Sequence, residues 1–233
     1  TNLGFSGGNN VGIEKALLDP ECRYIFFLNN DTVIDPDALN QLLEIAEAND
    51  YQNYGSFQPL MINYYQRSLV DSAGLEYSHN SLGYNRGTGR KVVEFSESTE
   101  IIGCCGGAFL CRRAAVEKLQ AQSGGFFAQE FFAYCEDLDA GLRLQAIGWP
   151  ALYVPKALVY HKGGQTAKNF SQKRIFWYNR NSLLVLLRNW PLRAILTNVV
   201  WLILGQLGMV IFAFIRSPRR GWYSLKGKLV VCL

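Results

Sequence analysis

The sequence predicts an α/β protein whose mixed, mainly parallel sheet carries helices on both faces, followed by an apolar C-terminal helix. Three observations lead to this prediction. Strand and helix patterns alternate over the first two-thirds of the 233 residues, which is typical of sheets covered by helices. A hydrophobic content of 49%, with 13% aromatic residues, is ample for a core. Residues 194–215 are 22 consecutive residues without a charge, and the length of the chain suits one domain, or one domain plus an appendage.

The first quarter of the chain is expected to fold as helix, strand, helix and strand. "SGGNNVGIEKALLD" continues at helical spacing through Ile13, Ala16 and Leu17. "RYIFFLN" is a continuous apolar run, as in a central parallel strand covered on both faces. In "DPDALNQLLEIAEA", Asp35 is the expected N-cap and Pro36 the first helical residue. "GSFQPLMI" is expected to be a further strand.

The middle of the chain continues the alternation. Residues 63–100 are polar and rich in glycine and tyrosine, which predicts a hairpin and loops over an exposed edge. "CCGGAFLCRRAAVEKLQA" predicts a strand running into a helix, and another helix is expected from about Glu136 to Ile147, ended by Gly148. "ALYVPKALVYH" predicts one or two short strands that end at His161, and "SQKRIFWYNRNSLLVLLRNW" predicts a basic, aromatic-rich helix.

The last third is basic and then strongly apolar. After Lys162, Lys and Arg recur while Asp and Glu do not occur, which predicts an anionic partner, either phospholipid or nucleic acid. A helix over residues 194–215 would cover roughly 33 Å, enough for a hydrocarbon core of about 30 Å. We therefore expect membrane lipid as the partner and no nucleic acid. Spanning the membrane, dipping into it and lying on it stay open, and a buried helix of a soluble protein is the alternative.

The cysteines and the first residues give two further expectations. Six cysteines in apolar contexts, without C-x-x-C spacing, predict buried free thiols and a reducing compartment. The chain begins without an initiator Met or a signal peptide, so we expect it to be part of a longer protein. The net charge of +4 is mild.

Polar residues stand where two predicted strands end. Asn29, Asn30 and Asp31 follow the apolar strand, and ligands of open α/β sheets bind beyond the carboxyl ends of strands. A carboxylate there, next to a helix N-terminus, can hold a divalent cation and through it a diphosphate; a plain turn is the alternative. His161 also ends a strand, so it could face the same crevice, where imidazole is acceptable to Mn²⁺. His79, in a polar loop, is expected at the surface.

Two acidic residues, Glu136 and Asp137, begin a predicted helix. The helix dipole favours carboxylates at this position whatever their function. In a pocket, one of them could take a proton from an acceptor hydroxyl as a general base.

Five stretches together resemble the family 2 glycosyltransferases. They are "NLGFSGGNNVGI", "FLNNDTVIDPDAL", "GGAFLCRRAAVEKL", "FFAYCEDLDAGLRLQAIGW" and "YVPKALVYHKGG". The resemblance covers nearly all of residues 1–190 and is closest to the rhamnosyltransferase-like branch that builds bacterial cell-surface polysaccharide. It implies a GT-A nucleotide-diphospho-sugar transferase domain over residues 1–190, and we expect residues 191–233 to form a membrane-associated segment.

The resemblance also implies roles for single residues. The family's D-x-D motif, which holds Mn²⁺ or Mg²⁺ and the donor diphosphate, falls on residues 29–31, so that only Asp31 supplies a carboxylate. The family's catalytic base falls on Glu136 and Asp137, with Asp137 the better candidate, and His161 falls where some relatives have a metal ligand. The other implied donor-binding residues are Gly4, Gly7, Gly8, Asn10, Asn29, Asn30, Gly106 and Gly107.

Two departures from the family pattern matter. The family begins with a "V-DNGS" strand that binds the nucleoside base, and this chain starts after it. "NRNSLLVLLRNW" is not the Q-x-x-R-W motif of processive synthases, which favours transfer of a single sugar.

The resemblance therefore implies inverting transfer of rhamnose or a similar sugar. The donor would be a nucleotide-diphospho-sugar and the acceptor a lipid-linked glycan, at the cytoplasmic face of the bacterial inner membrane. A catalytically inactive sugar-nucleotide-binding membrane scaffold is the alternative. A sugar-nucleotide pyrophosphorylase is disfavoured, because its glycine-rich N-terminal signature with Arg and Lys is not visible.

Overall fold

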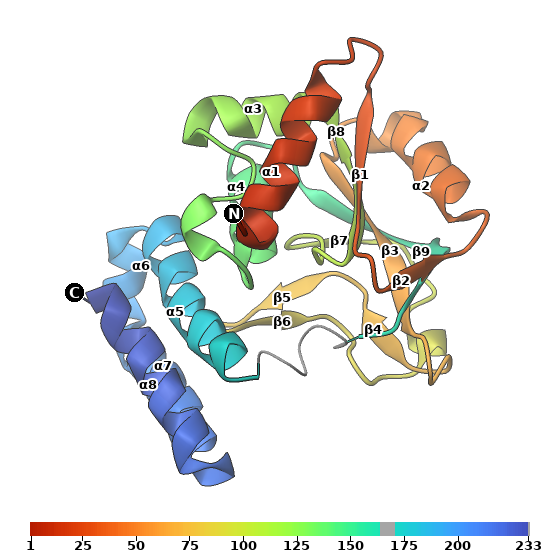
Figure 1. The fold of residues 1–233 in the computed structure, drawn as a ribbon. Helices are drawn as coiled ribbons and strands as arrows, with labels where there is room; N and C mark the ends of the chain where they lie inside the picture. The colour runs from red at the N-terminus through yellow and green to blue at the C-terminus, as the bar shows by residue number, and fades with distance from the viewer. Residues whose placement is uncertain (164–170, 233) are drawn as a thin grey trace.

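A mixed sheet lies at the centre of the protein (Figure 1). The computed structural model describes residues 1–163 and 171–232. Within them, the seven strands of this sheet are β1 (Tyr24–Leu28), β2 (Thr32–Ile34), β3 (Ser56–Asn63), β4 (Val70–Ser72), β7 (Thr99–Ile101), β8 (Ala108–Arg112) and β9 (Ala151–His161). Their order is β1-β8-β3-β9-β2, with β4 beside β3 and β7 beside β9. A separate hairpin of β5 (Leu75–Tyr77) and β6 (Gly83–Asn85) lies in the segment where the sequence predicts one.

The sheet is mixed, as predicted, but it is not mainly parallel. β3 and β9 run parallel, whereas every other pair formed by the described strands of this sheet is antiparallel. β1 pairs antiparallel with β8 and stands at one end of the strand order. Of its five residues only Phe27 is buried, so the prediction of a central parallel strand is wrong. A run of apolar residues carries no information about strand direction or order.

Helices cover both faces of the sheet, as predicted (Figure 1). These helices are α1 (Gly4–Leu17), α2 (Ala38–Glu47), α3 (Arg113–Ser123) and α4 (Glu136–Ala146). Leu42 and Ala46 of α2 pack on one face, against buried residues of β3, β8 and β9. A second cluster of buried apolar residues holds the other helices, through Ile13 of α1, Leu119 of α3 and Leu144 of α4. Short 3₁₀ turns occur at η1 (Asn49–Tyr51), η2 (Val92–Glu94) and η3 (Gln129–Phe131).

The N-terminus of α2 differs from the prediction. The helix begins at Ala38, with Asp37 at the N-cap position in place of Asp35. Pro36 and Asp37 form a turn in which the Ala38 N–H donates to the Asp35 carbonyl at 3.0 Å. The side chain of Asp35 caps this turn, because its Oδ1 accepts from the Asp37 N–H at 3.2 Å.

The cysteines agree with the prediction of free thiols. The five described cysteines form no disulfide, and Cys104, Cys105 and Cys111 are buried. Burial raises the pKa of Cys104 and Cys105 to about 12, because a thiolate is poorly solvated in an apolar core. These thiols are therefore structural and unreactive.

The C-terminal part is a group of four helices beside the sheet domain (Figure 1). They are α5 (Ser171–Asn189), α6 (Leu192–Thr197), α7 (Val199–Arg216) and α8 (Pro218–Cys232). The single helix predicted over residues 194–215 is split at Asn198, whose side chain donates to the Ala194 carbonyl at 2.9 Å. α8 packs closely on α5: a Cβ on Gly227 would lie 2.5 Å from the carbonyl oxygen of Phe176.

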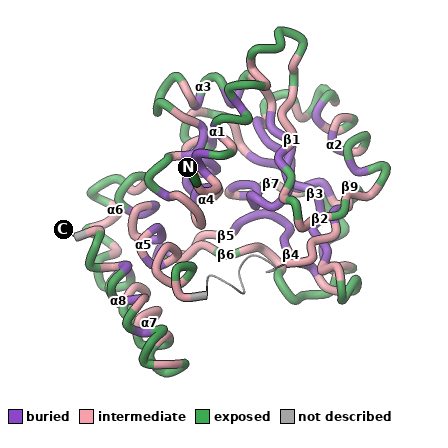
Figure 2. Tube along the Cα trace, viewed as in Figure 1, coloured by how far each residue is buried: buried purple, intermediate pink, exposed green. Residues whose placement is uncertain are grey.

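α7 is the one described helix that is long and apolar enough to cross a membrane. Only 11% of its residues are buried, and Figure 2 shows it exposed along most of its length, in contrast to the sheet. This exposure disfavours the alternative of a buried helix in a soluble protein.

Candidate active site

An open pocket with a volume of about 720 Å³ lies where β1 and β9 end. The start of α4, the β5–β6 hairpin and α5 complete its wall. Eight of the predicted site residues line it: Asn29, Asn30, Asp31, Gly106, Gly107, Glu136, Asp137 and His161. The fold therefore brings the predicted metal and diphosphate residues and the predicted catalytic acids to one pocket.

Strand pairing places Asp31 beside His161. After β1 the Asn29 N–H donates to the Gly107 carbonyl at 2.9 Å, which fixes the turn. The chain then returns as β2, in which Thr32 lies opposite His161 of β9. As a result the Oδ1 of Asp31 is 3.3 Å from the Nε2 of His161. The expectation that both residues face one crevice agrees with this geometry.

The other ring nitrogen of His161 meets a residue that the sequence did not single out. The Nδ1 atom is 2.8 Å from the Oδ2 of Asp71 in β4. The hydrogen bond to Asp71 raises the pKa of His161, partly opposed by burial. Asp71 was missed because it stands in a polar stretch where a single carboxylate has no local signature.

The described residues contain no group of three or more His, Cys, Asp or Glu side chains arranged to hold a metal ion. Asp31 and His161 nevertheless fit a divalent cation as a pair. A carboxylate oxygen suits Mn²⁺, and an imidazole that is itself oriented by a second carboxylate is acceptable to it. A ligand's phosphate oxygens would have to complete the coordination. Metal binding at this pair stays a prediction.

Asp137 and Glu136 have different surroundings at the start of α4. The Oδ2 of Asp137 accepts from the Gly106 N–H and its Oδ1 from the Leu138 N–H, both at 2.9 Å. Glu136 is only 5% exposed, and within the described residues its Oε2 has no hydrogen-bond partner. Burial raises the pKa of both acids, and the charge of Asp137 raises that of Glu136 further. Because the two backbone donors stabilise a carboxylate, Asp137 is the anion of the pair and Glu136 the neutral acid.

Replacing Glu136 by Gln is expected to stabilise the protein increasingly as the pH rises. The pKa of Glu136 in the folded protein lies well above its ordinary value of 4.5. The buried carboxyl is therefore tolerated while it is protonated, at low pH, and it opposes folding once it must be buried as an anion. The contribution of the protonated carboxyl to stability is complete below the unfolded pKa and is lost as the pH rises through the folded pKa. Gln stays neutral throughout. Thermal unfolding of both proteins from acidic to neutral pH measures the difference, and a difference that is constant with pH would contradict the assignment.

The acids are presented by a strained loop. Phe132, Tyr134 and Cys135 all have positive φ angles, of 62°, 74° and 68°. Such angles are costly for residues with a Cβ and persist only where surrounding contacts hold them. Cys135 is the N-cap of α4, so this strain lies directly before Glu136.

Asn181 of α5 holds this loop in place. Its side chain is fully buried, and its Nδ2 lies 2.9, 2.9 and 2.7 Å from the carbonyl oxygens of Phe131, Ala133 and Tyr134. The neighbouring Arg180 donates to the Glu130 carbonyl at 2.6 Å. Sequence reasoning missed Asn181 because an Asn within a basic helix reads as part of its polar face.

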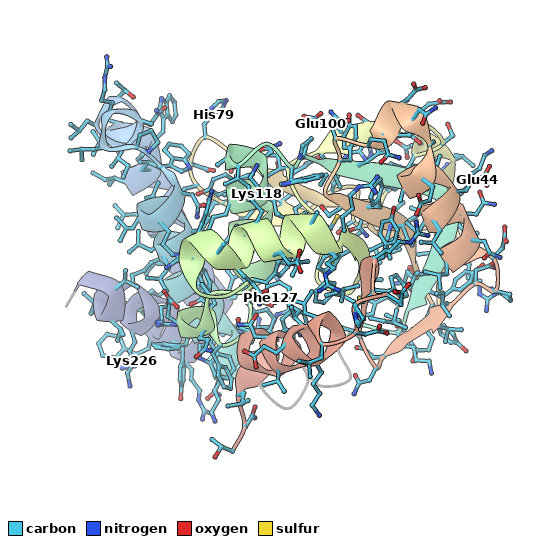
Figure 3. All side chains as sticks on the ribbon, turned by 90° about the horizontal axis from the view of Figure 1, so that it is seen from above. Glu44, His79, Glu100, Lys118, Phe127 and Lys226 are labelled. Carbon is cyan, nitrogen blue, oxygen red and sulfur yellow. The ribbon has the colours of Figure 1, made fainter. Side chains whose placement is uncertain are left out.

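The predicted nucleotide contacts Gly4, Gly7, Gly8 and Asn10 lie in α1 and do not line the pocket. The buried Asn10 side chain exchanges two hydrogen bonds with the backbone of Phe127, at 2.7 and 3.0 Å. Figure 3 shows Phe127 between α1 and α3. A Cβ on Gly4 would lie 2.3 Å from the Phe132 carbonyl oxygen. These contacts support the loop before the acids, and nucleotide binding by the four residues stays a prediction.

The opposite wall of the pocket comes from α5 and the β5–β6 hairpin. Arg174 and Tyr178 line it, and the Tyr178 hydroxyl donates to the Gly83 carbonyl at 2.6 Å. The hairpin also contacts α7, because Gln206 donates to Ser81 Oγ at 2.8 Å. His79 in the same hairpin is exposed, as predicted (Figure 3).

Comparisons with known proteins identify the family of this chain. The sequence model of a family described as glycosyl transferase family group 2 matches residues 24–227. The rhamnosyltransferase WbbL of Escherichia coli (strain K12) is 26% identical over 196 residues, which are 79% of this chain and 70% of that protein. An N-acetylglucosaminyl-diphospho-decaprenol L-rhamnosyltransferase of Mycobacterium tuberculosis (strain CDC 1551 / Oshkosh) is 33% identical over 137 residues, which are 54% of this chain and 39% of that protein.

A solved structure supports the fold class. The crystal structure of GalNAc-T7 with UDP, GalNAc and Mn²⁺ matches with a TM-score of 0.52 at 14% identity, over 76% of this chain and 37% of that chain. At this identity the likeness shows the fold alone, and it confirms the predicted GT-A class. Since the family match extends over most of the sequence, this chain belongs to glycosyl transferase family group 2 and is a glycosyltransferase.

Proposed function

We propose that the protein is an inverting glycosyltransferase that moves one sugar, rhamnose or a similar one, from a nucleotide-diphospho-sugar to a lipid-linked glycan. The proposed setting is cell-surface polysaccharide synthesis at the cytoplasmic face of the bacterial inner membrane. Two curated relatives are rhamnosyltransferases. The name of the second specifies an acceptor in which a diphosphate joins a sugar to a lipid.

One observation carries the proposal: a single pocket holds both the Asp31–His161 pair and the Glu136–Asp137 pair. Sugar transfer from a nucleotide donor needs a place for a diphosphate and a base for the acceptor hydroxyl. The first pair suits the diphosphate through a cation, and Asp137 suits the base.

In the proposed reaction the acceptor hydroxyl attacks the anomeric carbon from the face opposite the diphosphate. The new carbon–oxygen bond forms while the bond to the diphosphate breaks, and the bonding electron pair leaves with the nucleoside diphosphate. Asp137 takes the hydroxyl proton, while the N–H groups of Gly106 and Leu138 keep its carboxylate in position. A Mn²⁺ or Mg²⁺ ion, when bound by Asp31 and His161, would supply positive charge beside the departing diphosphate.

The lipid-linked acceptor is supported by the position of the hairpin wall. Residues 80–85 join the pocket to the C-terminal helices, because Gly83 accepts from Tyr178 of α5 and Ser81 from Gln206 of α7. A lipid that enters along α7 would therefore bring its head group to this side of the pocket.

The exposed face of α7 is the proposed membrane contact. Its exposed large apolar residues are Val199, Val200, Trp201, Ile203, Leu204, Leu207, Ile211, Phe212, Phe214 and Ile215. Exposed cations follow at the turn into α8, namely Arg216, Arg219 and Arg220. Exposed apolar residues that end in a basic cluster are typical of a helix that contacts an anionic membrane with its cationic end at the lipid head groups.

Changing Arg216, Arg219 and Arg220 together to Glu is expected to weaken binding to anionic vesicles by about 100-fold or more, since each basic residue near an anionic surface contributes about 1 kcal/mol. Co-sedimentation with phosphatidylglycerol vesicles measures this loss. The matched control changes Lys15 and Lys156 of the sheet domain to Glu, which should leave binding close to that of the wild type. Equal binding by all three proteins would contradict the proposed contact.

The function itself is tested by nucleoside diphosphate release. The protein in bacterial lipid extract with Mn²⁺ is given dTDP-, UDP- and GDP-sugars in turn. Release from one donor that also depends on the lipid acceptor is the expected result, and it names the donor. Nucleotide binding without release from any donor would favour the inactive scaffold instead.

A further inference from the structure

The imidazole ring of His161 lies between two carboxylates from different strands. Its Nδ1 is 2.8 Å from Asp71 Oδ2 and its Nε2 is 3.3 Å from Asp31 Oδ1. Strand pairing produces this arrangement: His161 lies opposite Asn63 of β3, and the preceding residue of β3, Ile62, pairs with β4. All three side chains are largely buried, with exposed fractions of 18–20%.

The two contacts decide which tautomer the neutral ring adopts. A carboxylate can only accept a hydrogen bond, so the short contact to Asp71 requires the ring proton on Nδ1. The Nε2 atom then carries a lone pair, and this lone pair faces Asp31 Oδ1. Two acceptor atoms 3.3 Å apart repel each other unless positive charge lies between them. A divalent cation supplies that charge to the neutral ring, as a second proton on Nε2 does when the ring is protonated.

Asp71 is not a ligand of the same ion. The two ring nitrogens point in widely different directions, so a cation on Nε2 is out of reach of the carboxylate that bonds Nδ1. This agrees with the absence of a three-residue ligand group in the part of the chain that the structure describes. The effect of Asp71 on the cation is therefore exerted through the ring.

We propose that Asp71 is a positioning residue that holds His161 as the Nδ1–H tautomer and keeps Nε2 available, opposite Asp31, to a divalent cation. This inference rests on the proposed function only in that the cation serves the transfer reaction. Carboxylates that orient a ligating histidine in this way typically strengthen metal binding by about 10- to 100-fold.

The tautomer is measured directly by ¹⁵N NMR of the imidazole nitrogens at alkaline pH, where the rings are neutral. The chain has two histidines, so the exposed His79 serves as a reference in the same spectrum. The wild type should show His161 with the proton on Nδ1. In Asp71→Ala, Asp31 is the remaining carboxylate at the ring, and the proton should move to Nε2. A wild-type ring protonated on Nε2, or a tautomer that does not change in Asp71→Ala, overturns the inference.

The second measurement is Mn²⁺ affinity, from the EPR signal of free Mn²⁺, without any sugar donor. Asp71→Ala should bind Mn²⁺ about 10- to 100-fold more weakly than the wild type. Asp71→Asn keeps a neutral hydrogen-bond acceptor beside the ring, so its Mn²⁺ affinity should fall less. Asp31→Ala shows how far the Mn²⁺ affinity falls when a direct ligand is removed. The exposed Asp50→Ala should bind like the wild type. Equal affinities in Asp71→Ala and the wild type overturn the inference.

The two measurements separate this inference from the proposed function. If sugar transfer fails while the tautomer and Mn²⁺ affinity change as expected, the proposed function falls and the role of Asp71 stands. If transfer succeeds while neither quantity responds to Asp71→Ala, the role of Asp71 falls alone. Circular dichroism of each variant checks folding, and Asp71→Asn, which is nearly isosteric, carries the test if Asp71→Ala does not fold.

Discussion

Asp137→Asn is expected to lower the rate of sugar transfer by about 10²- to 10⁴-fold, the range that a positioned general base contributes. The amide cannot take a proton from the acceptor hydroxyl, although it keeps the size of the carboxylate. Nucleotide binding should change little, because the diphosphate is expected at Asp31 and His161. Nucleoside diphosphate release at saturating donor measures the rate, and equilibrium titration of the donor measures binding.

The control for this variant is Asp50→Asn, at an exposed residue of η1, which should transfer sugar like the wild type. The pH profile adds a second criterion. Since burial raises the pKa of Asp137, the rate should rise with pH through a value above that of an ordinary Asp and then level off. Retained turnover in Asp137→Asn would move the base assignment to another residue of the pocket.

Asn181→Asp is expected to cost about 1–3 kcal/mol in the free energy of unfolding, because a carboxylate oxygen replaces the buried donor Nδ2. The other oxygen keeps its cationic donor, since Arg180 Nη1 donates to Asn181 Oδ1 at 3.0 Å. The wild-type amide donates toward three carbonyl oxygens, and a carboxylate would repel all of them. Thermal unfolding measures the loss, with the exposed Asn40→Asp of α2 as control.

The same variant has a pH signature. A buried aspartic acid at position 181 would have a raised pKa, and in its protonated form it can still donate one hydrogen bond. The destabilisation should therefore shrink at acidic pH and grow as the pH rises. Unfolding temperatures equal to those of the wild type at neutral pH would show that the loop before Glu136 does not depend on Asn181.

Some site residues could be predicted from the sequence, because their positions follow from a local pattern. Asp31 comes shortly after one recognisable strand and His161 ends another, so their meeting at one crevice could be predicted before the pairing of β2 with β9 was known. Glu136 and Asp137 begin a helix whose end, at Ala146 before Gly148, also follows from its sequence.

What sequence reasoning missed depends on distant contacts. The position of β1 at the sheet edge depends on strand order, to which its own apolar residues give no clue. Asp71 matters because β4 pairs with β3, and Asn181 matters because α5 lies against the loop before α4. Arg188 looked like part of a basic surface, yet it pairs with Glu130 at 2.6 Å and with the buried Asp139 at 3.1 Å.

The edge position of β1 also affects how readily the isolated chain associates in solution. Its outer row of backbone N–H and C=O groups faces no other strand among the described residues, and its five residues, Tyr24–Leu28, carry no charge. Strands of this kind pair readily with copies of themselves. Concentrated solutions of this chain should therefore associate through β1, and an added lysine in that strand should improve its colloidal stability.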